Sequence, residues 1–261
     1  MLNGEKPPML KSLSRAALAL SLLPNAGAAT LHFATQDFPP FIEVSDKPQP
    51  QGLMVDVLVS ACQRLGWSCE IQPMVWRRAL LLAEEGKVDG IFPVQDTPER
   101  RLSLALSAPV FNSSYGLFAT ASSNFRYQQP QDLALRRIAV YGPSITQNAL
   151  DKLVAGLPNI NITVENNQET VLKKLAALRY GADAVVFANE DVTRFLIRRE
   201  ALSGIRPLAT IQPLTYLYGF PLKNVKPNTV ADFNQALAAM CRDGTLPRLA
   251  RRYNVRMAGC K

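Results

Sequence analysis

The chain has 261 residues, more than a single domain usually contains, and its formal net charge is +8. Its lysines and arginines are scattered, with short pairs such as Arg136-Arg137 and Arg198-Arg199, and they form neither a basic helix nor a stripe of aromatic and basic residues. This pattern argues against a nucleic-acid partner. It predicts a solvated basic surface that attracts small anions.

The amino-terminal segment, residues 9–28, has the composition of a secretory signal. Basic residues come before the apolar run AALALSLL, and residues 26–28 (Ala-Gly-Ala) form a small-residue cleavage site. The apolar run is too short to span a bilayer stably. We therefore expect residues 1–28 to be a signal peptide cleaved near Ala28, and the mature protein to be soluble and periplasmic. A buried amino-terminal helix is the alternative.

After the signal segment, strands and helices are predicted to alternate, as in an α/β protein with largely parallel sheets. The run LHFAT (residues 31–35) predicts an early strand, and a helix is predicted to open at residues 52–56 (GLMVD). Further along, LLLA (residues 80–83) lies in a predicted helix that Gly86 stops. The run VDGIFPV (residues 88–94) then predicts a buried strand.

Thr97 is predicted to open the next helix, because its hydroxyl can accept from free backbone amides and Pro98 suits the first helical position. Arg100 then falls in the first turn, where a cation opposes the helix dipole. That placement becomes favourable if a bound anion neutralises the guanidinium. The alternative is an ordinary surface arginine after a loop.

Two segments of the chain echo each other. Residues 86–92 (GKVDGIF) and residues 181–187 (GADAVVF) each combine a helix stop, an aspartate and a buried strand. The echo indicates two lobes built alike, although a glycine before an apolar strand is also common by chance. Between the two segments, a strand is predicted to end at Gly142, and Ser144 is placed to cap the helix SITQNALDKLV.

Several short motifs occur in a fixed order along the chain. They are Phe38-Pro39-Pro40-Phe41, Gly52-Leu53-Met54-Val55-Asp56, Leu65-Gly66, Trp76, Gly86-Lys87-Val88-Asp89, TPER at residues 97–100, the strand ending at Gly142, and Asp243-Gly244-Thr245 before a final helix. Together they resemble the bacterial family 3 periplasmic solute-binding proteins, the group that contains amino-acid receptors of uptake transporters. The match extends over nearly the whole exported chain.

The resemblance implies an α/β fold of the periplasmic binding protein-like II (Venus-flytrap) type, with two lobes and two hinge crossings. We expect the first lobe to comprise residues 29–118 and 217–261, and the second lobe residues 119–216. The crossings are expected near residues 119–121 and 215–217. A chain that leaves one lobe and returns to it makes two hinge strands, which favours closure around a ligand.

The resemblance also implies ligand-binding residues where strand ends from both lobes face one cleft. Arg100 matches the arginine that clamps the ligand α-carboxylate, a group that suits the planar guanidinium fork. Gln95 and Thr97 lie in the same segment as Arg100 and are expected to add amide, hydroxyl or backbone contacts to the ligand. Phe38 matches the aromatic that packs on the ligand side chain, and Trp76 matches a pocket wall, unless both side chains belong to the core.

On the second lobe, Ser144 matches a hydroxyl that meets the same carboxylate, unless it only caps its helix. One position departs from the family pattern. Amino-acid-binding members place an acidic residue just after the strand at residues 184–187, where it pairs with the ligand ammonium. A strict alignment puts Ala188 there, and a small shift would restore Asn189 or Glu190. Asp191 is then a candidate cap for the next helix.

The four cysteines agree with export. Some amino-acid-binding members of the family carry a disulfide between a helix and the following strand, which implies that Cys62 pairs with Cys69. Cys241 and Cys260 are then left to pair around the carboxyl-terminal helix. Three pairings are possible in principle, and a zinc site is the rival. With one histidine and no CxxC spacing, we expect no metal and no cofactor.

These features favour a binding protein that captures a small carboxylate, an amino acid or a derivative, and delivers it to a membrane transporter permease. Arg78 would favour a dianionic ligand if it lies near the cleft, and it is otherwise part of a solvated helix face. We expect a monomer without a nucleic-acid partner.

Two other functions remain open. The family includes a periplasmic cyclohexadienyl dehydratase, and Asp37 and Glu190 are the candidate acids for such an elimination. Because no Ser/His/Asp or Cys/His arrangement can be built on His32, we expect a binder without enzymatic activity. The fold also occurs as the sensor of membrane kinases, so the other alternative is a receptor for a membrane sensor.

Overall fold

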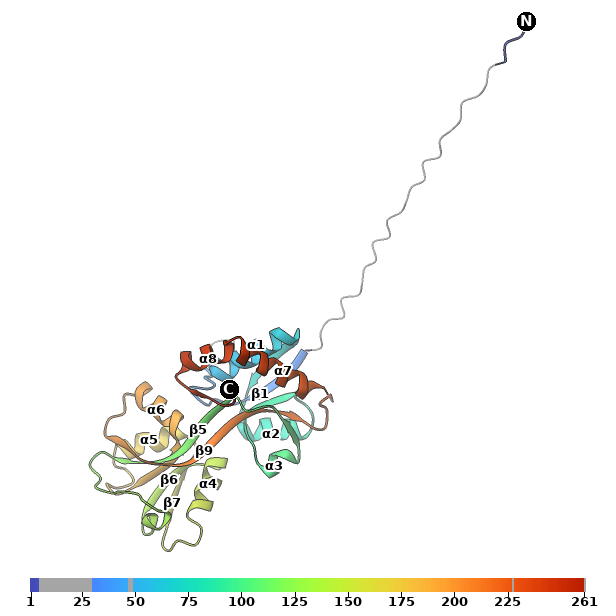
Figure 1. Cartoon of the computed structure of the whole chain (residues 1–261). Coiled ribbons are helices and arrows are strands. Elements are labelled where there is room, and N and C mark those ends of the chain that lie inside the picture. Colours follow the sequence, from blue (N-terminus) through green and yellow to red (C-terminus); the bar gives the residue numbers. More distant parts are fainter. Residues whose placement is uncertain (5–29, 47–48, 227, 261) are drawn as a thin grey trace.

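A computed structural model describes residues 1–4, 30–46, 49–226 and 228–260 of the chain (Figure 1). Almost all of the predicted signal peptide, including the cleavage position near Ala28, lies outside these residues. Within the described ranges, no helix combines the length and the apolar character that crossing a membrane requires.

Strands and helices alternate along most of the described chain (Figure 1). The strands are β1 (Thr30–Thr35), β2 (Ser68–Pro73), β3 (Gly90–Gln95), β4 (Leu104–Leu106), β5 (Phe111–Thr120), β6 (Arg137–Tyr141), β7 (Asn161–Glu165), β8 (Val185–Asn189), β9 (Ile205–Pro221) and β10 (Arg256–Met257). The α-helices are α1 (Leu53–Leu65), α2 (Trp76–Glu84), α3 (Pro98–Arg101), α4 (Ile145–Leu153), α5 (Gln168–Ala176), α6 (Glu190–Arg199), α7 (Thr229–Arg242) and α8 (Thr245–Tyr253). A 3₁₀ turn, η1, covers Pro130–Leu133.

The strands form one sheet in the order β2-β1-β3-β9-β5-β8-β6-β7, with β4 added to β9 and β10 added to β5. β1 is parallel to β2 and β3, and β6 is parallel to β7 and β8. β9 and β5 run antiparallel to each other and to the strands that flank them. The sheet thus has a parallel group at each end and an antiparallel ribbon between them.

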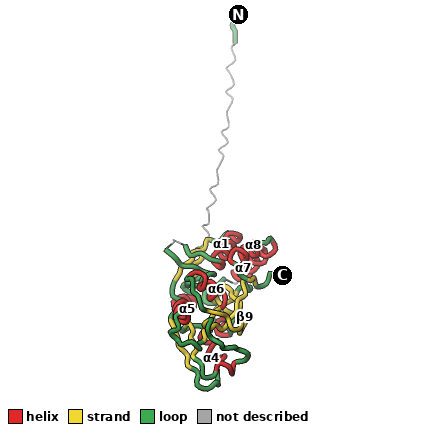
Figure 2. The backbone as a smooth tube through the Cα atoms, turned by 90° about the vertical axis from the view of Figure 1, so that its left-hand side faces the viewer, coloured by secondary structure: helices red, strands yellow, loops and turns green. Residues whose placement is uncertain are grey.

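The two parallel groups lie in two lobes that β5 and β9 join (Figure 1). α1, α7 and α8 pack together at the far end of the first lobe, and α4 lies toward the opposite end of the molecule (Figure 2). The predicted two-lobed α/β fold with two hinge strands is confirmed. β5 pairs with β10 at Phe111 and Asn112, and with β8 from Tyr115 to Ala119. This register indicates that β5 passes from the first lobe to the second between Asn112 and Tyr115. The predicted lobe boundaries stay predictions.

Local sequence explains the elements that lead to the strand ends. Gly86, just after α2, has φ +70°, a conformation that stops a helix at little cost in glycine. β3 is buried along almost its whole length. The Thr97 hydroxyl accepts a hydrogen bond from the Arg100 amide at 3.3 Å, and Pro98 takes the first helical position of α3. The predicted helix stop, buried strand and cap are therefore all confirmed.

Two disulfides bind helices to neighbouring segments. Cys62 near the end of α1 joins Cys69 of β2, with 6.3 Å between their Cα atoms. The chain turns between them at Gly66, whose φ of +64° allows its amide to bond back to α1. Cys241 of α7 joins Cys260 beyond β10, with 5.3 Å between their Cα atoms. Both predicted pairings are confirmed, the first implied by the family resemblance and the second by the two cysteines that remain.

Non-reducing peptide mapping of the exported protein should recover two cross-linked peptides, one with Cys62 and Cys69 and the other with Cys241 and Cys260. The sequence separations of 7 and 19 residues make both closures short, and an oxidising compartment preserves them. Free thiols or crossed pairs would contradict both the topology and the exported location.

Candidate functional site

The carboxyl ends of one strand from each lobe meet on the hinge strands. Gln95, the last residue of β3, pairs with Tyr216 of β9, and Asn189, the last residue of β8, pairs with Tyr115 of β5. Tyr115 also pairs with Gln212, which lies on the same strand as Tyr216. The two strand ends are therefore neighbours. Open α/β sheets bind their ligands beyond such ends.

Hydrogen bonds connect the two lobes at this place. Gln95 Nε2 donates to the hydroxyls of Tyr115 at 3.0 Å and Tyr216 at 3.3 Å. Asn189 Nδ2 donates to the Tyr216 hydroxyl at 3.1 Å, and the Thr146 hydroxyl of α4 donates to that of Tyr115 at 3.4 Å. We call Gln95, Tyr115, Thr146, Asn189 and Tyr216 the hinge cluster. It brings together two of the predicted site residues, Gln95 and Asn189, through a shared tyrosine.

The two phenols of the hinge cluster are uncharged at neutral pH. Burial raises the pKa of Tyr216 well above its usual value, and the neighbouring Tyr115 raises it further. Burial also raises the pKa of Tyr115, against the opposing effect of hydrogen bonds from Thr146 and Gln95. Because the remaining members are amides and a hydroxyl, the cluster provides polar groups without a net charge.

Asn189 is only 1% exposed and uses both ends of its amide. Its Oδ1 accepts from the Val192 amide at 3.0 Å and so caps α6, while its Nδ2 also donates to Ser113 Oγ at 3.0 Å. The suggestion that Asp191 caps this helix is wrong, because the last residue of β8 already supplies the capping oxygen. Asn189 as a ligand contact stays a prediction.

The two carboxylates that follow Asn189 are held inside the second lobe. Glu190 accepts from the Thr210 hydroxyl at 2.5 Å and from Arg194 at 3.1 Å. Asp191 accepts from Ser113 Oγ at 2.6 Å and from Arg194 at 2.7 Å. One arginine of α6 therefore pairs with both carboxylates and balances one of their two charges. The predicted contact between Glu190 and a ligand remains untested.

Arg100 is a partly buried cation without a partner. Neither a hydrogen bond nor an ion pair holds its guanidinium within the described part of the chain, whereas its neighbour Arg101 forms a two-pronged pair with Asp96 at 2.5 and 2.6 Å. Burial lowers the pKa of Arg100, and the carboxylates of Glu84 and Glu99 oppose that shift. An arginine stays protonated under these conditions, so its fork is available to an oxyanion.

The predicted aromatic walls are both partly buried. Phe38 stacks on Phe41, with ring centroids 5.5 Å apart, and meets Tyr216 edge-on at 5.4 Å. Trp76, in the first turn of α2, packs against a small apolar cluster that includes Ala79 and Val94. Phe38 therefore lies beside the hinge cluster, and Trp76 is held by a separate group of side chains.

Ser144 performs the capping role that the sequence offered as an alternative to ligand binding. Its hydroxyl accepts from the Gln147 amide at 3.2 Å and donates to the Tyr141 carbonyl at 2.7 Å. The α4 helix that it caps also carries Thr146 of the hinge cluster. A contact between Ser144 and a ligand carboxylate stays a prediction.

Sequence reasoning missed Tyr115, Tyr216 and Thr146. The two tyrosines lie in long strands whose neighbours are also apolar or hydroxylated, and Thr146 lies within an ordinary helical run. Their hydrogen bonds join residues from 20 to 121 positions apart, so no local pattern marks them. The tyrosine-rich run LTYLYGF in β9 is the one available signal, and it does not show which hydroxyl faces the second lobe.

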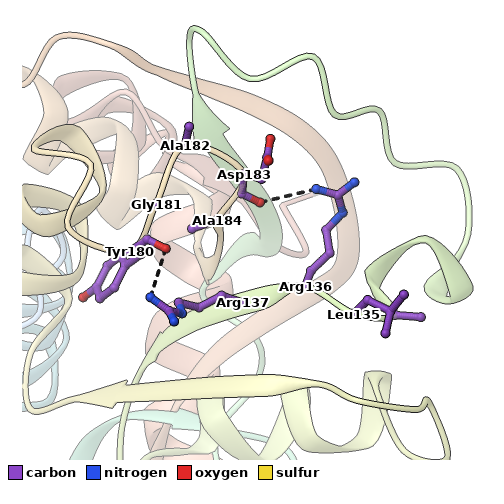
Figure 3. Close-up of a pocket in the computed structure, with 9 residues that line it drawn as sticks. Leu135, Arg136, Arg137, Tyr180, Gly181, Ala182, Asp183 and Ala184 are labelled. Carbon is purple, nitrogen blue, oxygen red and sulfur yellow. Dashed lines mark hydrogen bonds between the residues drawn. The ribbon is translucent and has the colours of Figure 1, made fainter.

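Two surface hollows lie apart from the predicted site residues. Figure 3 shows one of about 620 Å³, formed by residues 134–137 and 180–184 at the amino ends of β6 and β8. Two arginines there donate to backbone carbonyls and so stabilise the connecting loops. The other hollow, of about 560 Å³, lies between Pro40, Glu43, α6 and the end of α8.

The family profile of the bacterial extracellular solute-binding proteins, family 3, matches residues 31–256. The chain belongs to this family. The match covers both lobes and both hinge strands, which agrees with the architecture described above. No curated protein matches this family member.

Solved structures with the same fold include binding proteins and a sensor. A histidine kinase sensor domain with similarity to periplasmic binding proteins is 20% identical, with a TM-score of 0.77, and the match covers 88% of this chain and 99% of that one. An ancestral arginine-binding protein bound to arginine is 20% identical, with a TM-score of 0.74 and coverages of 86% and 97%. An ancestral amino-acid-binding protein, a precursor of cyclohexadienyl dehydratase, is 20% identical, with a TM-score of 0.71 and coverages of 86% and 94%. At this identity the likeness shows the fold.

Proposed function

We propose that this family member captures a small carboxylate in the periplasm and delivers it to a membrane transporter. The observation that carries the proposal is the unpartnered, partly buried guanidinium of Arg100, which follows the carboxyl end of β3. A cation in that position gains a charge-assisted hydrogen bond when a carboxylate arrives. Membership of a solute-binding family supports binding as the purpose of that contact.

A thermal-shift screen of the mature protein against amino acids, opines, dicarboxylates and polyamines tests the proposal. A ligand present at about 100 times its dissociation constant should add about 2.7 kcal/mol of apparent stability. Carboxylates should give the shift and polyamines should not. A response to polyamines alone would exclude a carboxylate site.

An enzyme is the second candidate, and two observations favour it. One similar structure is a precursor of cyclohexadienyl dehydratase, and this chain has two candidate acids, Asp37 and Glu190. Asp37 is exposed and Glu190 is buried. Proton transfer requires an acid within hydrogen-bond reach of the substrate. Both carboxylates already accept hydrogen bonds from the protein, which supports binding over elimination.

We expect the protein to close around its ligand by hinge motion and to release it unchanged. Small-angle scattering should then show a smaller radius of gyration with ligand, and mass spectrometry should find no product. A dehydratase would instead consume a cyclic prephenate-like acid. Product formation that Glu190→Gln or Asp37→Asn abolishes, while Arg100-dependent binding persists, would reject the binder and establish the enzyme.

A further inference from the structure

We propose that the ligand is a small organic acid that carries no ammonium group. This inference rests on the proposed function and narrows the ligand class of the same site. It follows from an inventory of the charged side chains around the strand ends. In the described part of the chain, that inventory contains a cation without an ion pair, and carboxylates at the end of β8 that already accept hydrogen bonds from the protein.

Whether the site can bind an amino acid depends on how it would hold the ammonium group. At neutral pH an α-amino acid has an ammonium beside its carboxylate. Moving that ammonium out of water is costly unless a carboxylate pairs with it. A site for amino acids therefore needs an anionic side chain in addition to a cation such as Arg100.

The carboxylates at the end of β8 are not available for this purpose. Glu190 and Asp191 share Arg194 as a counter-ion, and their other oxygens accept from the Thr210 and Ser113 hydroxyls. A ligand ammonium would have to displace at least one of these partners. The residue just before them, Ala188, is buried and has no polar side chain.

The carboxylates of the first lobe near the carboxyl ends of β1 and β3 are exposed, and several of them have protein partners. Asp37 accepts from the Val44 amide at 2.9 Å. Asp96 is paired with Arg101 at 2.5 Å. Glu99 is stabilised as an anion by hydrogen bonds from its own backbone amide and from Thr97, and more weakly by Lys152 of α4 and by Arg100, which together lower its pKa. Glu84 is an exposed carboxylate at the end of α2.

Three arginines near the ends of β2 and β3 form no ion pair in the described ranges. Arg77 and Arg78 in the first turn of α2 are exposed, and Arg100 has only the electrostatic influence of Glu84 and Glu99. The hinge cluster between the lobes is neutral. A ligand carboxylate therefore has a cation to pair with, whereas a ligand ammonium finds no carboxylate at the end of β8 that is free of protein partners.

Matched pairs of ligands that differ by the ammonium alone test the inference. The pairs are propionate and L-alanine, succinate and L-aspartate, glutarate and L-glutamate, and 3-phenylpropionate and L-phenylalanine. Titration calorimetry of the mature protein gives the affinity for each. For the pair of the right size, the acid without the ammonium should bind at least about tenfold more tightly. Equal affinities, or tighter binding of the amino acid, would overturn the inference and leave the proposed function intact.

If the proposed function is wrong, no member of any ligand pair binds. That result would reject the inference as well.

A charge variant adds an independent check. Asn189→Asp keeps the shape and the capping oxygen while adding one negative charge to the hinge cluster, and it should narrow the affinity ratio of the preferred pair several-fold. Asn148→Asp, on an exposed position of α4, should leave the ratio unchanged. A ratio unaffected by Asn189→Asp would contradict the electrostatic argument.

Discussion

Replacing Arg100 with alanine should abolish binding of the carboxylate ligand. The substitution removes the unpartnered guanidinium and leaves the anion facing neutral donors. The loss should be at least about 2 kcal/mol, the scale for truncating one side of a buried charged pair. Titration calorimetry with the tightest carboxylate from the screen measures it directly. Arg100→Lys should recover part of the loss, because a lysine keeps the charge and lacks the planar fork.

Arg101→Ala is the matched control for that experiment. Arg101 lies next to Arg100 in α3, is more exposed, and is already paired with Asp96. Its removal changes the net charge by the same amount and should leave the affinity within a factor of about two. If Arg100→Ala binds like the wild type, the carboxylate site is wrongly placed.

Replacing Asn189 with alanine should strongly destabilise the protein even without ligand. The change removes the cap of α6, which contributes about 1 kcal/mol, and takes one hydrogen-bond partner each from the Tyr216 and Ser113 hydroxyls, which keep Gln95 and Asp191. Each lost hydrogen bond costs about 0.5–1.5 kcal/mol, so the total loss should be about 2–4 kcal/mol. Urea unfolding followed by circular dichroism measures the free energy of unfolding.

Two control variants show whether the loss of stability comes from the contacts of Asn189. Asn148→Ala removes an exposed amide from α4 and should change the free energy of unfolding by less than about 0.5 kcal/mol. Asn189→Asp retains an oxygen for the Val192 amide and should be less destabilising than Asn189→Ala. A loss in Asn189→Ala no larger than in the exposed control would show that the hinge cluster contributes little to stability.

The sequence predicts the elements near the site because their signals are local. Gly86 stops α2, Thr97 caps α3 and Ser144 caps α4, and each of these roles depends on residues within a few positions. The order of the motifs predicts the two-lobed fold for a different reason. The resemblance to a known family predicts how the elements are arranged, which the local signals do not indicate.

The hinge cluster could not be predicted in the same way. Asn189 contacts Ser113 and Tyr216 because β8 pairs with β5 and β5 pairs with β9, and that register is set by the whole sheet. The sequence predicts the wrong cap for α6 for the same reason, because the cap also depends on contacts with a distant strand. From sequence, Asp191 and Asn189 are equally good caps, and the choice depends on Ser113 of a distant strand, which engages Asp191.

The first lobe is assembled from both ends of the chain. β9 lies between β3 and β5, and α1 packs against α7 and α8, which follow β9 in sequence. The second lobe, in contrast, is built from one continuous stretch between the hinge strands. A chain that emerges amino terminus first can therefore complete its second lobe while the first still waits for its last helices. A stop codon after β9 would leave the second lobe complete and the first lobe without α7, α8 and β10, which pack against α1 and β5.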